Sequence, residues 1–402
     1  MPKILEDVKV IELTHSLAGA YCAKLLADQG ADTIKIEPPG RGDASRYEPP
    51  FIGGTPNRER SSLFLAFNTN KQSITLDINT PEGKTLFLDL VKESDIVIES
   101  FPPGHLDDIG LEYAELHKIN KEIILTSVTY FGQTGPYKQY KGDDLTAQAM
   151  GGYLFAVTGL ADKPPMGTAL YQMDITAARN GATATLAALF QQRDSGLGQH
   201  VDVSEVEAAI STPGGLIQQY SFVGAVQRRG GGERNVLDGM HLNTKDGEVT
   251  LTTAGTGGRP METWAEFLGE PQLLDSKFSS RQGRSQNWEE LYKLVQNKLI
   301  EWNNLDLMEA TTAKGLVIGL VQNLSQVINS PHLEGRECFA ELNHGEVGTL
   351  KYPGPGFLLD GENPMRGTSA APLLGEDNES IFCDRLKLSK DRLEQLKTTG
   401  IV

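Results

Sequence analysis

Short apolar runs alternate with helix-like segments through the first half of the chain, and this alternation restricts the fold more than any other feature. Residues 8–13 resemble a strand, residues 20–29 a helix that Gly30 ends, and residues 33–37 a second strand. A strand, a crossing helix and a parallel strand form a right-handed βαβ unit. The sequence therefore predicts an α/β region with a mainly parallel, helix-covered sheet.

The same alternation continues before the pattern becomes helical near Asp143. We expect further strands at residues 73–78, 95–99 and 123–131 and a helix at residues 81–93, with Pro81 in its first turn. Helices are then predicted at residues 145–155, 175–193 and 203–222, with Pro213 and Gly214-Gly215 bending or breaking the last one. A strand at residues 248–253, short helices to about residue 320 and a helix at residues 390–398 follow, which indicates a smaller second domain after residue 225.

Composition and charge exclude several classes of protein. None of the apolar runs in the 402 residues reaches the roughly 18 residues of a membrane helix, and residues 1–13 do not resemble an export signal, so we expect a cytoplasmic protein. Three widely spaced cysteines and seven histidines without ligand spacing predict neither disulfides nor a metal centre. The net charge of −16 argues against binding nucleic acid. A phosphate-rich cofactor would have to be held by local amides and a few cations.

The loop after the first strand could serve a nucleotide. Residues 14–20 read THSLAGA, which lacks the G-x-G-x-x-G pattern that lets a pyrophosphate approach the backbone. The sequence therefore argues against NAD or a flavin. A small-residue loop that enters a helix still offers free amides to an anion, although the pattern alone favours a structural turn.

A second candidate site lies at Asp174, just before an alanine-rich helical run. The pattern alone favours an N-cap, because aspartate accepts hydrogen bonds from the exposed first-turn amides. The functional alternative uses the same contacts. A carboxylate that helix-end amides hold ionised and fixed in direction is what a carboxylate nucleophile requires.

Motifs along nearly the whole chain resemble the family III CoA-transferases (the CaiB/BaiF family), which include the α-methylacyl-CoA racemases. The matching segments contain LADQGADTIKIEP, FGQTGPY, SGLGQHVDVS and APLLGE and lie, together with Asp174, at residues 18–38, 42–46, 70–77, 99–104, 131–137, 187–189, 195–204 and 371–376. Each segment alone is a weak signal. Their number and order make the resemblance specific.

The resemblance implies a CoA-transferase, with coenzyme A as a substrate and neither a metal nor NAD. It implies that Asp174 attacks a donor acyl-CoA, that an aspartyl-CoA thioester forms through a mixed anhydride, and that a small carboxylic acid accepts the CoA. It also implies an interlocked homodimer with a Rossmann-like large α/β domain (1–225), a small α+β domain (226–325) and a C-terminal segment (326–402) that returns to the large domain.

The resemblance also implies a CoA site and a mobile loop. The expected CoA contacts are His15, Ala18, Leu76, Ile78, Ser100, Phe101 and Lys141. Gly230, Gly231 and Gly232 match the loop that closes over the intermediate, with an interdomain linker as the alternative. This chain carries Pro38, Asn79 and Asp108 where members often carry basic residues, and Ser100 where they often carry asparagine.

Two other functions stay open at this point. A racemase of the same family needs a second acid or base, typically a histidine, where this chain reads Gly142-Asp143-Asp144; Asp143 could act as a base. A non-catalytic acyl-CoA binding protein is the other alternative. It would need no nucleophile at Asp174.

Overall fold

The residues of the chain divide into two units, each with its own sheet and core. The computed structural model describes residues 3–159, 163–212, 214–229, 241–252, 261–365 and 367–402. The first unit contains residues 1–158, 166–225 and 336–402, and the second contains residues 159–165 and 226–335. The first unit is thus assembled from both ends of the sequence.

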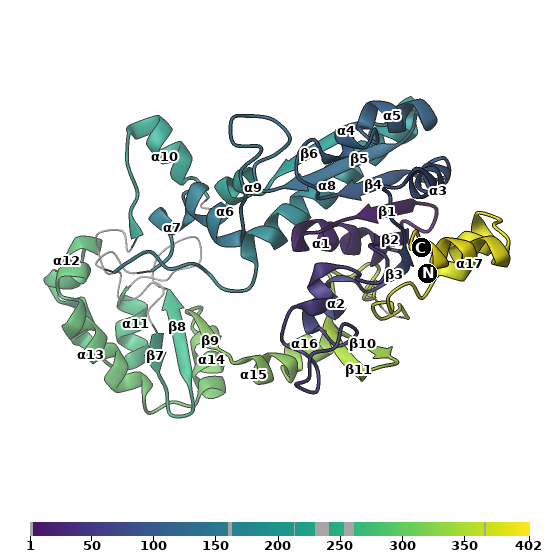
Figure 1. Cartoon of the computed structure of the whole chain (residues 1–402). Coiled ribbons are helices and arrows are strands. Elements are labelled where there is room, and N and C mark those ends of the chain that lie inside the picture. Colours follow the sequence, from purple (N-terminus) through teal and green to yellow (C-terminus); the bar gives the residue numbers. More distant parts are fainter. Residues whose placement is uncertain (1–2, 160–162, 213, 230–240, 253–260, 366) are drawn as a thin grey trace. The chain divides into compact units, whose positions relative to one another are not determined.

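A six-stranded parallel sheet is the centre of the first unit (Figure 1). Its order is β3-β2-β1-β4-β5-β6, with β1 at Lys9–Leu13, β2 at Asp32–Glu37, β3 at Lys71–Thr75, β4 at Ile96–Glu99, β5 at Ile124–Thr129 and β6 at His200–Ser204. The predicted parallel α/β sheet is confirmed. The strand order reverses between β1 and β4, and ligands of open α/β sheets bind beyond the carboxyl ends of the strands at such a point.

The sixth strand corrects the sequence-based expectation. Residues 203–222 are predicted as a helix that bends or breaks near Pro213, but residues 203 and 204 belong to β6. The helical part is α9 at Glu205–Ser211 and α10 at Leu216–Val223, so the expected break lies between them. Residues of β6 pair with β5 in parallel, from His200 opposite Leu125 to Ser204 opposite Thr129. This long-range pairing overrides local helical preference, and it brings the start of α9 to the carboxyl edge of the sheet.

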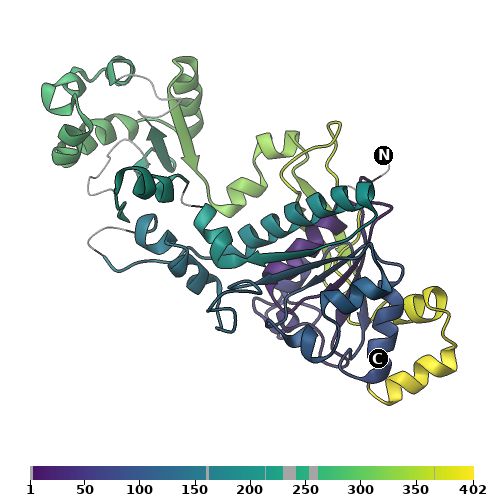
Figure 2. The same ribbon diagram turned by 90° about the horizontal axis from the view of Figure 1, so that it is seen from above.

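Helix α1 (Leu17–Ala27) and helix α8 (Gln172–Ser195) lie side by side on one face of the sheet (Figure 1 and Figure 2). Small side chains such as Cys22, Ala178 and Ala182 are buried in the cluster that joins them. A Cβ atom on Gly181 would lie 3.1 Å from Cys22 Sγ, so a larger residue there would push the helices apart. Both helices therefore begin close together at the carboxyl edge.

The opposite face of the sheet is covered by helices from both ends of the chain. Helix α3 (Pro81–Val91), helix α5 (Tyr113–Ile119) and the C-terminal helix α17 (Lys390–Thr398) bury apolar residues against the strands in one cluster. The remaining elements of this unit are a 3-10 helix (Ala44–Tyr47), α2 (Ser62–Phe67), α4 (His105–Asp108), α6 (Asp144–Met150), α7 (Tyr153–Ala156), a π-helix (Ser380–Arg385) and the antiparallel hairpin of β10 (Phe339–His344) and β11 (Gly348–Pro353).

Buried charges below the carboxyl edge are paired with one another. The Lys35 ammonium lies 2.7 Å from Glu12 and 2.6 Å from Asp43, and Lys71 lies 2.7 Å from the other Glu12 oxygen. These pairs fix the strands β1, β2 and β3 against one another through side chains as well as through the ladder. Because each buried charge has a partner, the large cost of burying it is offset.

Arg46 forms a second buried group of contacts and connects the two ends of the chain. Its guanidinium donates two hydrogen bonds to Glu37, at 2.7 and 2.8 Å, and one to Glu59 at 2.6 Å. It also donates to the Pro372 carbonyl at 3.2 Å and stacks 3.6 Å from the centre of the Phe64 ring. The C-terminal segment is thereby attached to the loop after β2.

The second unit has its own antiparallel sheet, of order β7-β8-β9, and its own core. Its strands are β7 (His241–Asn243), β8 (Glu248–Thr252) and β9 (Val317–Val321), and its α-helices are α11 (Met261–Leu268), α12 (Arg281–Gln286), α13 (Trp288–Leu299), α14 (Asn304–Ala313), α15 (Leu324–Ile328) and α16 (Pro331–Gly335). Trp264, Phe278 and Leu291 are buried at its centre. Among the helices of the described residues, none has the length and apolar character that crossing a bilayer requires.

Arg46→Ala should lower the free energy of unfolding by about 3–5 kcal/mol, because it leaves the Glu37 carboxylate buried without its partner. Arg58→Ala is the matched control: Arg58 also pairs with Glu59, but its side chain is 47% exposed. Its removal should change stability by less than about 1 kcal/mol. Chemical denaturation followed by circular dichroism measures the free energy of unfolding of both variants. Equal losses would show that the buried contacts of Arg46 contribute no more to stability than the exposed ion pair of Arg58.

Candidate active site

Asp174 lies in the first turn of α8, at the carboxyl edge of the sheet, and is only 4% exposed. The sequence pattern alone favours an N-cap, but Asp174 does not cap the helix. Tyr171, in a left-handed conformation with φ of 57°, occupies the cap position and makes no side-chain cap hydrogen bond. The Asp174 carboxylate is instead directed toward the start of α1, where the backbone N–H of Ala18 interacts with it.

The surroundings of Asp174 make its ionised form costly. Burial, followed by the nearby Asp144 and Asp143 carboxylates, raises the pKa of Asp174 to about 7, while the amides of Ala18 and of Asp174 itself act in the opposite direction. The sequence had suggested that helix-end amides would hold this group ionised. In the structure, burial and like charge outweigh the amides, so the group titrates near neutral pH.

Asp144 connects α6 with α8 through hydrogen bonds, and its carboxylate also raises the pKa of Asp174. One of its oxygens accepts a hydrogen bond from the Met173 backbone N–H at 2.6 Å, and the other accepts from Gln148 Nε2 at 2.5 Å. Asp144 therefore holds the start of α8 against α6. Asp143, its neighbour, caps α6 by accepting from the backbone N–H and the hydroxyl of Thr146, at 2.8 and 2.6 Å. These hydrogen bonds lower the pKa of Asp143.

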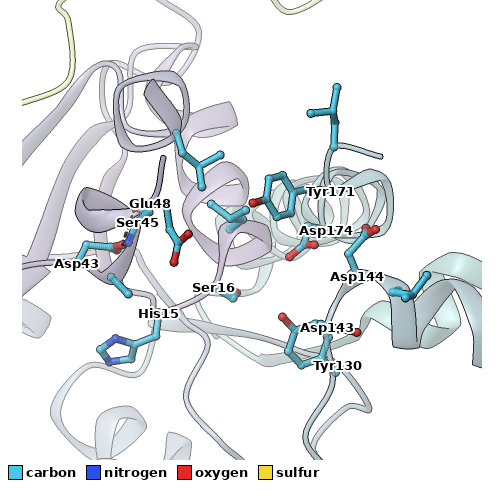
Figure 3. A pocket seen from close by; sticks show the side chains of 15 residues that line it. His15, Ser16, Asp43, Ser45, Glu48, Tyr130, Asp143, Asp144, Tyr171 and Asp174 are labelled. Atoms are coloured by element: carbon cyan, nitrogen blue, oxygen red, sulfur yellow. Dashed lines mark hydrogen bonds between the residues drawn. The ribbon is translucent and has the colours of Figure 1, made fainter. Parts of the chain in front are cut away.

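A cavity of about 470 Å³ surrounds the Asp174 carboxylate (Figure 3). Its polar and charged lining comes from the loop after β1, the loop after β2, the end of β5 and the starts of α6 and α8. These residues are His15, Ser16, Asp43, Ser45, Glu48, Tyr130, Asp143, Asp144, Tyr171 and Asp174. The lining is acidic, and its described residues include neither lysine nor arginine.

A second cavity of about 460 Å³ adjoins the first, because Ser16 and Tyr130 line both. It lies over the point where the strand order reverses, between the loops that follow β1 and β4. Its lining combines aromatic, basic and acidic side chains: Ser100, Phe101, Thr129, Phe131, Lys138, Tyr140, Lys141 and Glu205. An elongated ligand that filled both cavities would extend from Lys138 and Lys141 to Asp174.

Ser100 and Phe101 shape the boundary of this second cavity. The Ser100 hydroxyl accepts hydrogen bonds from the backbone N–H groups of His15 and Ser16, at 2.7 and 3.0 Å, and so attaches the loop after β1 to the loop after β4. The Phe101 ring lies between His15, 4.7 Å away at an edge-on angle, and His105, stacked at 4.4 Å. The flat rings of Phe101 and His15, which line the two cavities, could pack against an adenine or an amide plane.

The structure separates the residues expected to contact CoA into three groups. His15, Ser100, Phe101 and Lys141 line the two cavities. Ala18 is fully buried and can contribute only its backbone amide. Leu76 and Ile78 lie in the hydrophobic core cluster and line neither cavity, so their side chains contribute to packing. Gly230, Gly231 and Gly232 lie outside the described residues.

Tyr130, Asp144 and Glu205 belong to the site and were not predicted. Tyr130 and Glu205 directly follow β5 and β6, where side chains of a parallel sheet converge on the binding edge. Predicting β6 as a helix concealed the position of Glu205. The signal was present in the sequence, since residues 200–204 form a short run that ends in serine and resembles the end of a strand.

Similarity to known proteins shows the family of this chain. The model of CoA-transferase family III matches residues 5–378. The chain belongs to this family. It is 33% identical to the succinyl-CoA–D-citramalate CoA-transferase of Chloroflexus aurantiacus over 100% of this chain and 98% of that protein. It is 30% identical to the succinate–glutarate CoA-transferase of Agrobacterium fabrum, over 94% and 95%.

Solved structures agree with this assignment. A CAIB/BAIF family protein from Brucella suis superposes with a TM-score of 0.82 and 29% identity, covering 96% of this chain and 100% of that one. This family III CoA-transferase therefore moves CoA between carboxylic acids, with CoA thioesters as substrates. Its donor and acceptor acids are a separate question.

Asp174→Asn should stabilise the CoA-transferase. A carboxyl group whose pKa is raised by folding lowers stability once the pH exceeds its unfolded pKa, and the loss grows until the pH passes the folded value of about 7. We expect a gain on the order of 2 kcal/mol at pH 8 and almost none near pH 4. The exposed Asp194→Asn on the same helix should change stability by less than about 0.5 kcal/mol at both pH values. A loss of stability at pH 8 would contradict the electrostatic account.

Proposed function

We propose that this CoA-transferase works through an aspartyl-CoA thioester formed on Asp174. The observation that supports this most strongly is a buried carboxylate, facing a helix amide, in a cavity that adjoins a second one lined by basic and aromatic side chains. The carboxylate is aimed at a space that an acyl thioester could fill. A carboxylate tied into a cap would not be available for attack.

Transfer begins with attack of an Asp174 oxygen on the donor thioester carbonyl. The carbon–sulfur bond breaks, CoA thiolate leaves, and an acyl-aspartyl anhydride remains. The thiolate attacks the aspartyl carbonyl of the anhydride, releases the donor acid as a carboxylate and leaves the aspartyl-CoA thioester. The acceptor carboxylate then runs the same steps in reverse, which restores the Asp174 carboxylate without net uptake of a proton. The covalent carrier divides one difficult exchange into easier steps.

The local charges suit these steps. The partial burial of charge that raises the pKa of Asp174 makes its anion poorly solvated, and a poorly solvated carboxylate is the stronger nucleophile. Attack neutralises that anion and so relieves its repulsion from Asp144. The amide of Ala18 at the start of α1, where the helix dipole is positive, is placed to stabilise oxygen charge that develops at Asp174.

The second cavity is assigned to the CoA moiety. Lys138 and Lys141 would meet phosphates, and Phe101 with His15 would pack against the flat parts of the cofactor. Ser100, through its two backbone hydrogen bonds, would hold the loop that these groups share. Despite the net charge of −16, two local cations and backbone amides provide the anion contacts.

The wider arrangement is proposed from the resemblance and from the surface of the first unit. We infer an interlocked homodimer in the cytoplasm, with Gly230, Gly231 and Gly232 closing over the intermediate. Phe190 on α8 and Phe222 and Val223 on α10 are largely exposed, which a partner chain would cover. Succinyl-CoA is the first donor to test, because it is named in the functions of several relatives.

Asp174→Ala should reduce CoA transfer by about a thousandfold or more, while Asp194→Asn retains it, because only Asp174 carries the acyl group. In the wild type, kcat/KM for the acyl-CoA should rise with pH through about 7, since the protonated carboxyl cannot attack. A coupled assay that monitors acyl-CoA formation measures both. Transfer at the wild-type rate by the alanine variant would contradict the covalent mechanism.

Racemization is distinguished by hydrogen exchange. Asp143, which could have served as its second base, is engaged in capping α6. Incubation of an acyl-CoA in deuterated water without an acceptor acid should therefore leave the hydrogen next to the thioester unexchanged. Rapid exchange that depends on Asp143 would favour the racemase reaction instead.

A further inference from the structure

Glu205 is a buried acid that the steps above do not use. Its side chain is fully buried at the start of α9, and neither of its carboxyl oxygens has a hydrogen-bond partner among the described residues. It lines the second cavity, as does Thr129, whose buried hydroxyl oxygen also lacks a partner there. Buried polar groups without partners are rare and costly, so two of them at one cavity wall indicate that a ligand supplies the missing contacts.

The backbone holds Glu205 rigidly in this position. The N–H of the next residue, Val206, donates to the Tyr130 carbonyl at 3.1 Å, and the Ser204 hydroxyl donates to the same oxygen at 3.3 Å. The ends of β5 and β6 are thereby joined just before α9 begins. A side chain on a backbone fixed in this way has a constrained position beside the cavity.

The groups around Glu205 keep its proton on. Burial, then the carboxylates of Asp174 on α8 and Asp144 on α6, raise its pKa well above the usual range. Tyr130, at the end of β5, also faces it, and Lys138 and Lys141 line the same cavity. A neutral carboxyl group presents one donor and one acceptor side by side. The O–H can donate to the C=O of a secondary amide, or the carboxyl C=O can accept from its N–H, because a trans amide directs these two groups to opposite sides.

We propose that Glu205 binds, as a neutral acid, an amide of the pantetheine arm of CoA. The inference rests on the proposed function, which places the thioester at Asp174 and the phosphates near Lys138 and Lys141. The arm between them carries two secondary amides and must pass through the second cavity. Glu205 lines this cavity and not the one that contains Asp174, so it binds the pantetheine arm and takes no part in acyl transfer.

The test uses binding of free CoA to the Asp174→Ala protein, so that it does not depend on turnover. Glu205→Met, which keeps the volume and removes both polar groups, should weaken CoA binding roughly tenfold or more. Glu205→Gln, a neutral donor and acceptor of the same shape, should retain most of the affinity. Glu207→Met, an exposed acid two residues along α9, is the matched control and should bind CoA as its parent does.

Two further readouts separate amide binding from a merely structural role. Adenosine 3′,5′-bisphosphate, which is CoA without the phosphopantetheine arm, should bind equally well to all the variants. As the pH is raised, CoA binding should weaken for the Glu205 protein once the acid ionises beside Asp144, and should stay constant for Glu205→Gln.

Each failure has a distinct meaning. Unchanged CoA binding by Glu205→Met, an equal loss in Glu205→Gln, or a parallel loss of the bisphosphate would overturn the assignment of Glu205. A wild-type chain that binds CoA through Glu205 and yet transfers none would refute only the proposed function. The two proposals therefore fail separately.

Discussion

The close packing of α1 against α8 is the constraint on which the site depends. It requires small residues at the contact, with Gly181 against Cys22, where an added Cβ would lie 3.1 Å from sulfur. Because the helices touch and both begin at the carboxyl edge, the Ala18 amide faces the Asp174 carboxylate. A wider separation would leave that carboxylate in water with an ordinary pKa. It would then be a weaker nucleophile.

Two groups of buried charges in one unit have opposite character. Glu12, Lys35, Lys71 and Asp43 compensate one another below the sheet edge, at distances of 2.6 to 2.7 Å. Asp174 and Glu205, above that edge, have no such cation partner among the described residues, and their pKa values are raised. Proteins commonly give up stability at functional sites. In this unit the uncompensated acids lie at the site, and the compensated charges lie in the scaffold below it.

The sequence predicted the elements whose patterns are local and missed those that depend on distant contacts. Strands β1 to β5 and α17 follow from apolar periodicity and caps, and the structure confirms them. Strand β6 is fixed by its pairing with β5, and although residues 200–204 resemble the end of a strand, they run directly into α9, so the predicted helix included the last two of them. Asp174 was found by its motif, but its raised pKa arises from Asp144, thirty residues away, and from burial. Glu205 required β6 to be placed first.

Isotope transfer from the acceptor acid tests the central claim most directly. If the acceptor carboxylate attacks an aspartyl thioester, the bridging oxygen of the second anhydride stays on Asp174 when the thiolate removes the acyl group. Turnover with an acceptor whose carboxylate carries a heavy oxygen isotope, followed by mass spectrometry of peptides, should therefore show heavy oxygen in the Asp174 peptide alone. Sustained transfer that leaves this peptide unlabelled would contradict the account.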